Sequence, residues 1–454
     1  MKASHGLVPV FDDRNLVSHA GLVPVLALAE KAGLTGLIEA SSTMPSANVA
    51  VKARTVLAGM LAGADSIDGL DLLRAGGTAR VAGAVRAPST IGTFLRDFTH
   101  GHVLQFAKVN RILLRRLIGE VPALAGTAGG LVLVDMDDTI REVHGYQKQA
   151  AAFGYSKVRG LNALLVTVTG QDAAPLIAEA SLRRGNIRSG DSADHHLARA
   201  LATVKESTPG RQVLTRADSA FCTHQNVTTA LRHGAWFSFT IPQWPTVARA
   251  IARIDETAWT RIEYPTAVLD EETGELISDA EVAETPFTAF VSHRKDEQIP
   301  CRLVVRRVRR LNENAKQGQQ TLFDAWRYHA FITNSPLGAV DADRFHRGHA
   351  IIEQVIAELK GGPLAHLPSG TFTANHAWAQ FAVIAHNLSR AAATAAGLGK
   401  ARMATLLRII VQTPARLAST GRRLVMHLPA HWPWARAWAR LWDTATGPPR
   451  TTPR

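Results

Sequence analysis

The amino-acid sequence predicts an α/β fold that follows a helical region and is interrupted by a β-rich insertion. The first observation is the helical spacing of apolar residues across residues 1–125. The second is a change at residue 126 to strand-like apolar runs bounded by Gly, Pro and polar clusters. The third is a helical segment between two of these runs. A strand–helix–strand order favours a sheet that contains a parallel pair.

The N-terminal region, residues 1–125, has helical apolar spacing in segments such as 46–64 and 102–119. Three cations share one face of the second segment, at positions i, i+3 and i+7: Lys108, Arg111 and Arg115. A basic stripe of this kind is typical either of a solvated helix face or of contact with a DNA backbone. We therefore predict a helical region that binds DNA, with a solvated face as the alternative.

The first part of the α/β core is predicted at residues 126–242. Its strand-like runs are residues 129–138, 162–170, 211–219 and 235–242. A helical segment lies between the second and third runs. It begins at Ser192, a residue type that often caps helices, and extends to residue 207.

Residues 243–330 break this pattern with an acidic stretch and short β-like pieces, so we predict a β-rich insertion there. Residues 331–395 are predicted to complete the core. They contain a long helical segment, 341–362, that ends in two glycines, which are typical of helix termini.

The C-terminal region, residues 396–454, is strongly basic. From residue 400 onward it has ten Lys or Arg residues and a single acid, Asp443. Three tryptophans at i, i+4 and i+8 predict a helix that packs against a core: Trp434, Trp438 and Trp442. Contact of the neighbouring arginines with nucleic acid remains an alternative.

The overall charge indicates a polyanionic partner. The 454 residues carry a net charge of +13, and the isoelectric point is near 10.2. Such a balance favours nucleic acid, although a generally basic protein of the cytosol is also consistent with it. No apolar run reaches the roughly 18 residues of a membrane span. Only two cysteines occur, which excludes a cysteine-rich metal module and fits a reducing compartment.

The segment 131–140 joins an apolar strand to three carboxylates. In a strand, Asp135 and Asp137 project to one side and Asp138 to the other. Asp218 ends a second predicted strand. Because sites in open α/β sheets form at the carboxyl ends of strands, we expect acids from these two strand ends to converge.

The helical segment 346–360 offers a third acid. Four polar residues fall in a narrow sector of its helical wheel, opposite a broad apolar face: His346, His349, Glu353 and Lys360. Two Asp and one Glu supply the oxygen ligands that Mg²⁺ or Mn²⁺ prefers, and two such ions can run an in-line phosphoryl transfer. Zinc held by the two histidines is an alternative, although no HExxH motif occurs.

These motifs resemble those of DDE transposases of bacterial insertion sequences, in the branch with a Y-R-E-K signature, and most closely its IS-thirteen-eighty group. The first motif, D-x-D-[SD]-T, matches residues 135–139, and the second, R-A-D-S, matches residues 216–219. The third motif matches within 346–360, where Arg347, Glu353 and Lys360 are among the matching residues. It departs in two places: His346 replaces the family Tyr and His349 replaces the family Arg.

The resemblance implies a ribonuclease H-like catalytic core interrupted by a β-rich insertion. It implies cut-and-paste DNA transposition, with two Mg²⁺ ions (Mn²⁺ substituting) held by Asp137, Asp218 and Glu353. We prefer Asp137 to Asp135 as the ligand because Asp137 precedes the [SD]-T pair. The expected partners are double-stranded DNA, as terminal inverted repeats and target, and a second copy of the chain on DNA. The expected location is the bacterial cytoplasm, in association with the nucleoid.

Further residues are expected to support the acids or to contact DNA. Lys360 is the first candidate, because it lies on the face of Glu353 two turns further along the helix. The remaining candidates are Arg347, His349, His346, Asp135, Lys157 and Arg159. In the family, the side chains at the two departing positions are thought to hold DNA phosphates, and histidine carries a full charge only when protonated.

Two rival functions stay open at this point. Residues 135–139 also resemble the D-x-D-x-T motif of haloacid-dehalogenase phosphatases, in which Asp135 would be the nucleophile and Asp137 the acid/base. That interpretation leaves Asp218 and Glu353 without a role. The other rival is a catalytically decayed transposase that only binds DNA.

Overall fold

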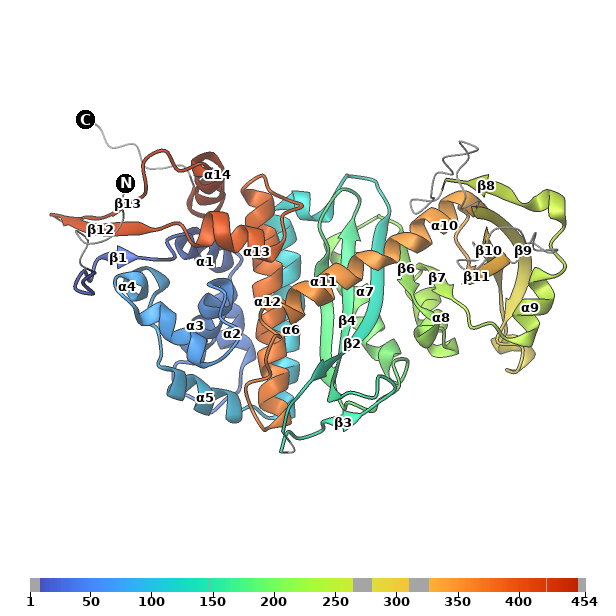
Figure 1. The fold of residues 1–454 in the computed structure, drawn as a ribbon, viewed down its shortest axis with the longest axis horizontal. Helices are drawn as coiled ribbons and strands as arrows, with labels where there is room; N and C mark the ends of the chain where they lie inside the picture. Colours follow the sequence, from blue (N-terminus) through green and yellow to red (C-terminus); the bar gives the residue numbers. More distant parts are fainter. Residues whose placement is uncertain (1–8, 146, 264–279, 310–325, 422, 448–454) are drawn as a thin grey trace, which may run out of the picture.

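The computed structural model describes residues 9–145, 147–263, 280–309, 326–421 and 423–447. These residues form a helical lobe, a ten-stranded mixed sheet and a small three-stranded sheet. The helical lobe lies at one end of the molecule and the β-rich insertion at the other, with the acid-bearing strands between them (Figure 1). The predicted α/β class is confirmed.

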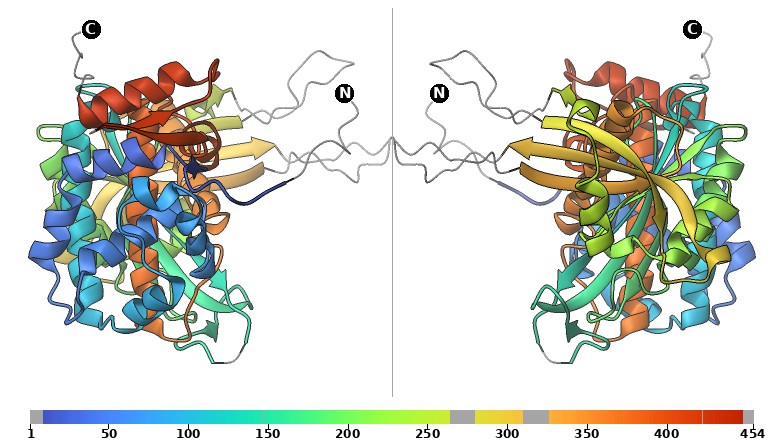
Figure 2. Two further views of the ribbon diagram at one scale, coloured as in Figure 1. Left: turned by 90° about the vertical axis from the view of Figure 1, so that its left-hand side faces the viewer. Right: turned by 90° about the vertical axis from the view of Figure 1, so that its right-hand side faces the viewer.

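The helical lobe combines helices from both ends of the chain. The N-terminal helices are α1 (Leu22–Lys31), α2 (Leu34–Ser41), α3 (Val49–Leu61), α4 (Thr78–Ala82), α5 (Pro88–Arg96) and α6 (His100–Glu120). The long α12 (Phe372–Ala395) packs against α6 and α3, and α14 (Ala435–Thr446) packs against α1 (Figure 2). The lobe therefore extends beyond the predicted 1–125 region, whose role in DNA binding stays a prediction.

Helix α12 is the most completely buried helix described, and it packs between the helical lobe and the large sheet. Every residue from Ala374 to Ala393 is buried. Many of these residues are alanines, whose short side chains let neighbouring elements approach closely. One side of α12 contacts the helical lobe and another contacts the large sheet, so the two share a continuous core.

The large sheet places the first motif in its middle. Its strands from the first core segment are β2 (Val132–Glu142), β3 (Ala152–Phe153), β4 (Arg159–Gly170), β5 (Leu176–Arg183), β6 (Val213–Ala217) and β7 (Trp236–Thr240). Strand β2 pairs antiparallel with β4 and parallel with β6, and β6 pairs parallel with β7. The helices that follow or link these strands are α7 (Ala193–Ser207) and α8 (His224–Arg232). The predicted parallel pair is confirmed.

Strand β5 was not predicted. It pairs with β4 at the side of the sheet and is almost wholly buried. Its sequence, LIAEASLR, contains a single β-branched residue and two alanines, so its intrinsic strand preference is low. Burial against α6, α7 and α12 decides its conformation.

The insertion continues the same sheet and does not form a sheet of its own. It contains α9 (Pro245–Ile251) and the strands β8 (Thr260–Ile262), β9 (Ala280–Ala289), β10 (Ile299–Arg309) and β11 (Trp326–Thr333). Strand β11 pairs antiparallel with β7, with Phe331 opposite Thr240. The predicted boundary at residue 330 therefore falls inside β11.

The predicted helix 341–362 is two helices with a tight turn between them. Helix α10 (Ala339–Arg347) and helix α11 (Ile351–Lys360) flank a 3-10 turn at Gly348–Ala350. At Gly348 the chain passes so close to Arg216 that a Cβ atom would lie 2.8 Å from its Nη1 atom. A side chain at this position would have to displace the guanidinium group of Arg216.

The end of the chain forms the small sheet and the last helices. Strand β12 (Ala415–Thr420) pairs with β1 (Leu16–Val17) and with β13 (Arg423–His427), and α13 (Met403–Leu406) precedes them. On α14, Trp438 is buried and stacks on Trp442 with ring centroids 5.3 Å apart. The predicted core packing of this helix is confirmed. Among the described residues, no helix has the length and apolarity to cross a membrane.

Candidate active site

Two acids meet where the parallel pairing of β2 with β6 ends. In the β2–β6 register, Asp135 lies opposite Arg216. Asp137 and Asp218 follow these residues by two positions each, so they lie side by side where β6 ends. The expected convergence of the acids is met by this pair. The prediction that the first acids end a strand is wrong, because β2 continues to Glu142 and pairs with β4 along its whole length.

Asp137 is half-buried and accepts a hydrogen bond from the backbone N–H of Asp138 at 2.7 Å. Burial raises the pKa of its carboxyl group to about 6, and the negative charges of Asp218 and Asp138 add to the rise. Within the described part of the chain, no Lys or Arg forms an ion pair with Asp137. The positive charge of His349 and the hydrogen bond from Asp138 offset the rise only in part.

Asp218 caps a 3-10 turn, Ser219–Phe221, by accepting a hydrogen bond from the backbone N–H of Ala220 at 2.9 Å. Loss of hydration raises the pKa of its carboxyl group, although its side chain is open to solvent, and the charge of Asp138 adds to the rise. Asp137 and Asp218 thus form an acidic pair that resists double ionisation.

Asp135 has a different environment from Asp137 on the same strand face. It is completely buried, and its Oδ1 and Oδ2 atoms accept hydrogen bonds from Arg216 Nε and Nη2, both at 2.7 Å. His349 Nδ1 lies 3.0 Å from Oδ1. Burial acts to raise the pKa of Asp135, but Arg216 and His349 outweigh it and lower the pKa. Asp135 is therefore an internal ion-pair partner.

Asp138, on the other face of β2, is held by three side chains. Its Oδ2 atom accepts hydrogen bonds from Arg183 at 2.6 Å and from Asn162 at 2.7 Å, and Oδ1 accepts one from the Ser189 hydroxyl at 3.1 Å. These contacts tie β2 to β4 and β5. They fit the structural role expected for an acid on this face.

His346 is fixed inside the protein. Its Nδ1 atom lies 2.9 Å from Ser238 Oγ and its Nε2 atom lies 3.0 Å from Thr240 Oγ1. The imidazole also stacks on Phe331, with centroids 4.1 Å apart and an interplanar angle of 8°. Burial lowers the pKa of His346 to about 3, and the positive charges of His349 and the nearby arginines contribute. The ring is neutral near pH 7.

Glu353 and Lys360 lie along α11, which packs against β2. Lys360 Nζ lies 3.3 Å from Thr139 Oγ1 at the end of the first motif. Glu353 is exposed and lines a cavity of about 280 Å³ with His346, His349 and Arg347. In the described residues, no three Asp, Glu, His or Cys side chains are close enough together to hold a metal ion. The structure brings Asp137 and Asp218 together but does not group Glu353 with them.

Comparison with known proteins decides the family. A family model described as "Transposase DDE domain group 1" matches residues 3–445. The chain belongs to this transposase family. No curated protein matches the sequence. A solved piggyBac transposase synaptic complex with hairpin DNA is 9% identical, covering 87% of this chain and 79% of the other with a TM-score of 0.37.

In this transposase-family chain, the remaining predicted contact residues lie on α10 and in the β3–β4 hairpin. Arg347 Nε donates a hydrogen bond to Asp343 Oδ2 at 2.8 Å within α10. Lys157 is exposed on a turn, with a positive φ of 57°. Arg159 donates a hydrogen bond to the backbone carbonyl of Gly145.

Tyr155 is a neighbour of the acids that was missed from the sequence. It is 67% exposed, and burial of its hydroxyl end raises its pKa together with the charges of Asp138, Asp137 and Asp218. The phenol therefore lies within the field of the acidic cluster. In the sequence, Tyr155 follows a glycine and lies two residues before Lys157, a predicted DNA contact. The sequence does not show that this turn lies within the field of the acids.

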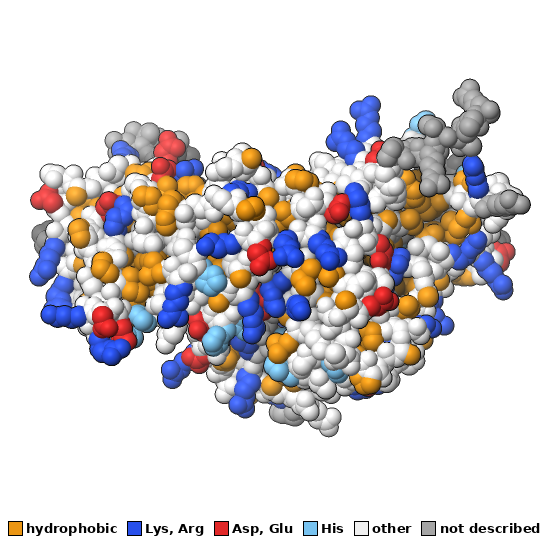
Figure 3. Space-filling model, turned by 180° about the vertical axis from the view of Figure 1, so that it is seen from behind, with side chains coloured by type: hydrophobic (Ala, Val, Ile, Leu, Met, Phe, Trp, Pro, Cys, Tyr) orange, Lys and Arg blue, Asp and Glu red, His pale blue; other side chains and the backbone are white. Residues whose placement is uncertain are grey.

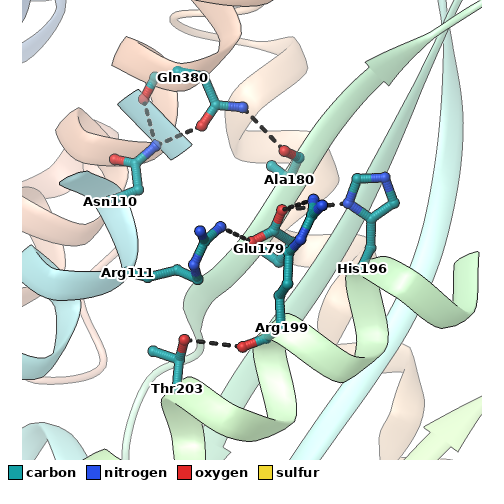
Figure 4. Close-up of polar contacts among 8 residues, drawn as sticks. All are labelled: Asn110, Arg111, Glu179, Ala180, His196, Arg199, Thr203 and Gln380. Carbon is teal, nitrogen blue, oxygen red and sulfur yellow. Dashed lines mark hydrogen bonds and ion pairs between the residues drawn. The ribbon is translucent and has the colours of Figure 1, made fainter. Parts of the chain in front are cut away.

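The basic stripe on α6 faces other parts of the transposase. Arg111 Nη1 lies 2.7 Å from Oε2 of Glu179, a buried acid on β5, and Arg115 pairs with Glu206 on α7. His196 and Arg199 also surround Glu179 (Figure 4). Figure 3 shows one whole face, on which Lys and Arg gather over the middle with Asp and Glu among them. Two of the three cations of the stripe, Arg111 and Arg115, therefore form ion pairs within the protein.

The donor set of Asp137 and Asp218 fits a hard divalent cation. Both supply carboxylate oxygens, and loss of hydration raises both pKa values, with neighbouring acids adding to the rise. A divalent ion relieves such repulsion and prefers oxygen ligands. His346 has no ring nitrogen free of a hydrogen-bonding partner, which argues against the zinc alternative.

Proposed function

We propose that this family member is a DDE transposase that catalyses metal-dependent DNA cleavage and strand transfer in the cut-and-paste transposition of an insertion sequence. The observation that carries the proposal is the Asp137–Asp218 pair, two acids with raised pKa values where the parallel pairing of β2 with β6 ends. The family match supports the class of reaction.

The strands β5, β4, β2, β6 and β7, with α7 and α8, are our candidate for a ribonuclease H-like core. The support is their mixed pairing, with the first acid on the central strand and the second on its parallel neighbour. Strands β8 to β11 are then the insertion, and α10 and α11 return the chain to the acids. The predicted boundaries at residues 125, 242 and 395 are retained as part of this proposal, and the one predicted at residue 330 moves to the end of β11 at Thr333.

Asp137, Asp218 and Glu353 are proposed to hold two Mg²⁺ ions, for which Mn²⁺ substitutes. When bound, the ions would activate the attacking hydroxyl group and stabilise the leaving oxygen of an in-line displacement. Glu353 is the outer member of this set, because it extends from the exposed side of α11. Its carboxylate would complete the ligand set of Asp137 and Asp218.

The reaction consists of two displacements at phosphorus. Attack by water forms one P–O bond and breaks another, which frees a 3′-hydroxyl at the end of the element. Attack by that hydroxyl on a second phosphodiester joins the element to its target and releases a new 3′-hydroxyl. Lys360 is proposed to contact a phosphate, because its ammonium group lies beside Thr139 at the acid-bearing strand. Arg347, Lys157 and Arg159 are weaker candidates.

Double-stranded DNA is the proposed substrate, as terminal inverted repeats and as target. The net charge of +13 favours a polyanion. Because cut-and-paste transposition joins two element ends in one event, we propose that two copies of the chain act together on DNA.

The test uses the purified full chain and labelled duplexes taken from the DNA that flanks its coding region. Strand nicking is measured with Mg²⁺, with Mn²⁺ and with EDTA. We expect Asp137→Asn, Asp218→Asn and Glu353→Gln each to lower nicking by at least about 100-fold while DNA binding persists. The matched control is Asp71→Asn, which removes an acid from an exposed surface pair with Arg74 and should leave nicking unchanged. Nicking by all three acid variants at the wild-type rate would overturn the proposal.

The phosphatase alternative is disfavoured by the surroundings of Asp135. Both of its oxygens accept hydrogen bonds from Arg216, and the residue is fully buried, so it is not placed as a phosphoryl-accepting nucleophile. The decayed-transposase alternative has a separate readout. Wild-type chain that binds the duplex ends but never nicks them in Mg²⁺ or Mn²⁺ would establish it.

A further inference from the structure

The three elements that carry the proposed metal ligands also meet in a buried ion network, formed by Asp135, Arg216 and His349. Each ligand follows one network member along the chain: Asp137 follows Asp135 on β2, Asp218 follows Arg216 after β6, and Glu353 follows His349 by one helical turn. The anchor on β2 and the ligand two residues later share one face of the strand, and the β6 pair has the same spacing. The network therefore joins β2, β6 and the start of α11 at positions next to the proposed metal ligands.

The contact between Arg216 and Asp135 fixes the two strands. The side chains are 1% and 0% exposed, and the guanidinium group binds both carboxylate oxygens at 2.7 Å. A bidentate pair of this kind constrains orientation as well as distance. Arg216 Nη1 also donates to the backbone carbonyl of Phe345 on α10, so one arginine joins β6, β2 and the helix.

His349 closes the network from the helical side. Its Nδ1 atom lies 3.0 Å from Asp135 Oδ1, and because an ionised carboxylate only accepts, Nδ1 must carry the hydrogen. His349 lies in the 3-10 turn directly before α11. The contact thus sets where α11, and with it Glu353, begins.

We propose that the Asp135–Arg216–His349 network is a positioning device, which fixes Asp137 and Asp218 beside each other and sets where α11, the helix that carries Glu353, begins. The inference rests on the proposed function. Crowded carboxylates repel one another, and the network opposes this repulsion at the positions next to the ligands. Ligand groups must be held to within about 0.5 Å, and side chains that orient metal ligands typically contribute about 10- to 100-fold in metal affinity. At the position of the family Arg, His349 acts through Asp135.

The test measures metal binding on DNA-free protein by Fe²⁺-directed hydroxyl-radical cleavage of the chain. Fe²⁺ takes the place of Mg²⁺, and fragments that end near residues 137 and 218 report its location. We expect His349→Ala to raise the Fe²⁺ concentration for half-maximal cleavage by about 10- to 100-fold. His349→Asn, whose amide can donate from the position of Nδ1, should restore most of the affinity. Arg216→Lys keeps the charge but loses the bidentate contact, and it should weaken cleavage as His349→Ala does.

The chain contains a matched control for this network. On β5, the buried Glu179 has the same kinds of partner, Arg111 at 2.7 Å and His196 at 3.3 Å (Figure 4). Through β4 it lies in register with Met136, so its side chain is on the opposite face of the sheet from Asp135 and Asp137. His196→Ala and Arg111→Lys should lower the melting temperature as much as the corresponding changes at His349 and Arg216. They should leave Fe²⁺ cleavage at the wild-type concentration.

The outcomes separate this inference from the proposed function. If Asp137→Asn and Asp218→Asn abolish Fe²⁺ cleavage while His349→Ala and Arg216→Lys bind as wild type, the positioning role is wrong and the metal site stands. If His349→Asn binds as poorly as His349→Ala, the hydrogen bond to Asp135 is not what matters, and the inference is also overturned. If neither aspartate variant changes cleavage, the proposed metal site itself fails.

Discussion

Asp135 and Asp137 share one face of β2, two positions apart, and yet their pKa values shift in opposite directions. Asp135 is the more buried of the two, but Arg216 and His349 neutralise its charge and keep it ionised. Burial raises the pKa of Asp137 to about 6, and the charges of Asp218 and Asp138 add to the rise. The sequence predicted that both acids share a face, but the partner that separates them lies on another strand. Only the fold brings Arg216 within reach.

The raised pKa of Asp137 predicts that Asp137→Asn stabilises the metal-free protein at neutral pH. Below pH 3.8 the carboxyl group is protonated in the folded and the unfolded chain, so the substitution has no effect there. Between pH 3.8 and about 6 the unfolded chain ionises first, which progressively destabilises the wild-type fold. Above that range the difference in unfolding free energy is constant, at up to about 3 kcal/mol.

Urea unfolding at pH 4, 5, 6 and 7.5 in EDTA measures this difference. Added Mg²⁺ should stabilise the wild type at pH 7.5 and leave Asp137→Asn unchanged, because ion binding to the native state depends on the carboxylate. The control, Asp135→Asn, should destabilise the protein, since it leaves Arg216 buried and unpaired. Equal stability of wild type and Asp137→Asn at pH 7.5 in EDTA would contradict the prediction.

His346 illustrates a limit of helical-wheel reasoning. Its spacing with His349, Glu353 and Lys360 defined a polar stripe, and that stripe lies at the border between the buried and the exposed side of the helix. The wheel could not show that Ser238 and Thr240, more than 100 residues earlier, occupy both ring nitrogens.

We predict that His346→Phe keeps the stacking on Phe331 but leaves the buried Ser238 hydroxyl without its partner, which costs about 1–3 kcal/mol of stability. Because the pKa of His346 is about 3, this loss should be the same at pH 5 and pH 8. Thermal unfolding at the two pH values and a duplex-binding titration test this. A large drop in DNA affinity without loss of stability would instead make His346 a phosphate contact.

At the scale of elements, α12 completes the edge of the large sheet. Strand β5 pairs only with β4, so its other edge presents unpaired backbone groups. Asn387 on α12 accepts from the Ile177 N–H at 2.8 Å and donates to the Ile177 carbonyl at 2.9 Å. Two turns earlier, Gln380 donates to the Ala180 carbonyl at 3.0 Å (Figure 4). The helix thereby stands in for a neighbouring strand.

This arrangement predicts that Asn387→Leu is strongly destabilising although the size of the side chain is preserved. Both backbone groups of Ile177 would be buried without partners, at a cost of about 2–5 kcal/mol in total. Chemical denaturation measures the loss, and hydrogen exchange at the Ile177 amide locates it. Ser389→Ala is the control, because that hydroxyl bonds only to Ala385 within its own helix and should be nearly neutral to remove. A stable Asn387→Leu variant with a protected Ile177 amide would show that the edge is satisfied in another way.

At the scale of the whole molecule, the sequence predicted the order of helical, sheet and insertion segments but not how they share a core. Strand β2 could be predicted because its run of β-branched and apolar residues is a local pattern. Helix α12 is buried on all sides because it packs against α3, α6 and β5, which are distant in sequence. Strand β11 joins the sheet because it pairs antiparallel with β7, which precedes the insertion. Local patterns do not encode such pairings. The grouping of Asp137 with Asp218 followed from strand order, whereas the position of Glu353 did not.

The distribution of charge leads to a prediction about DNA binding. If DNA lies along the acid-bearing side of the sheet, the exposed Lys157 should contact a phosphate, whereas Arg115 on α6 should not, because it pairs with Glu206. Each phosphate contact adds about 0.9 to the slope of log K against log salt concentration. Lys157→Ala should therefore reduce the slope by about 1, and Arg115→Ala should leave it unchanged. Both slopes are measured by duplex-binding titrations at KCl concentrations from about 50 to about 300 mM, where the release of counterions controls the salt dependence. The reverse result would place the duplex on the α6 face and support the DNA-contact interpretation of its basic stripe.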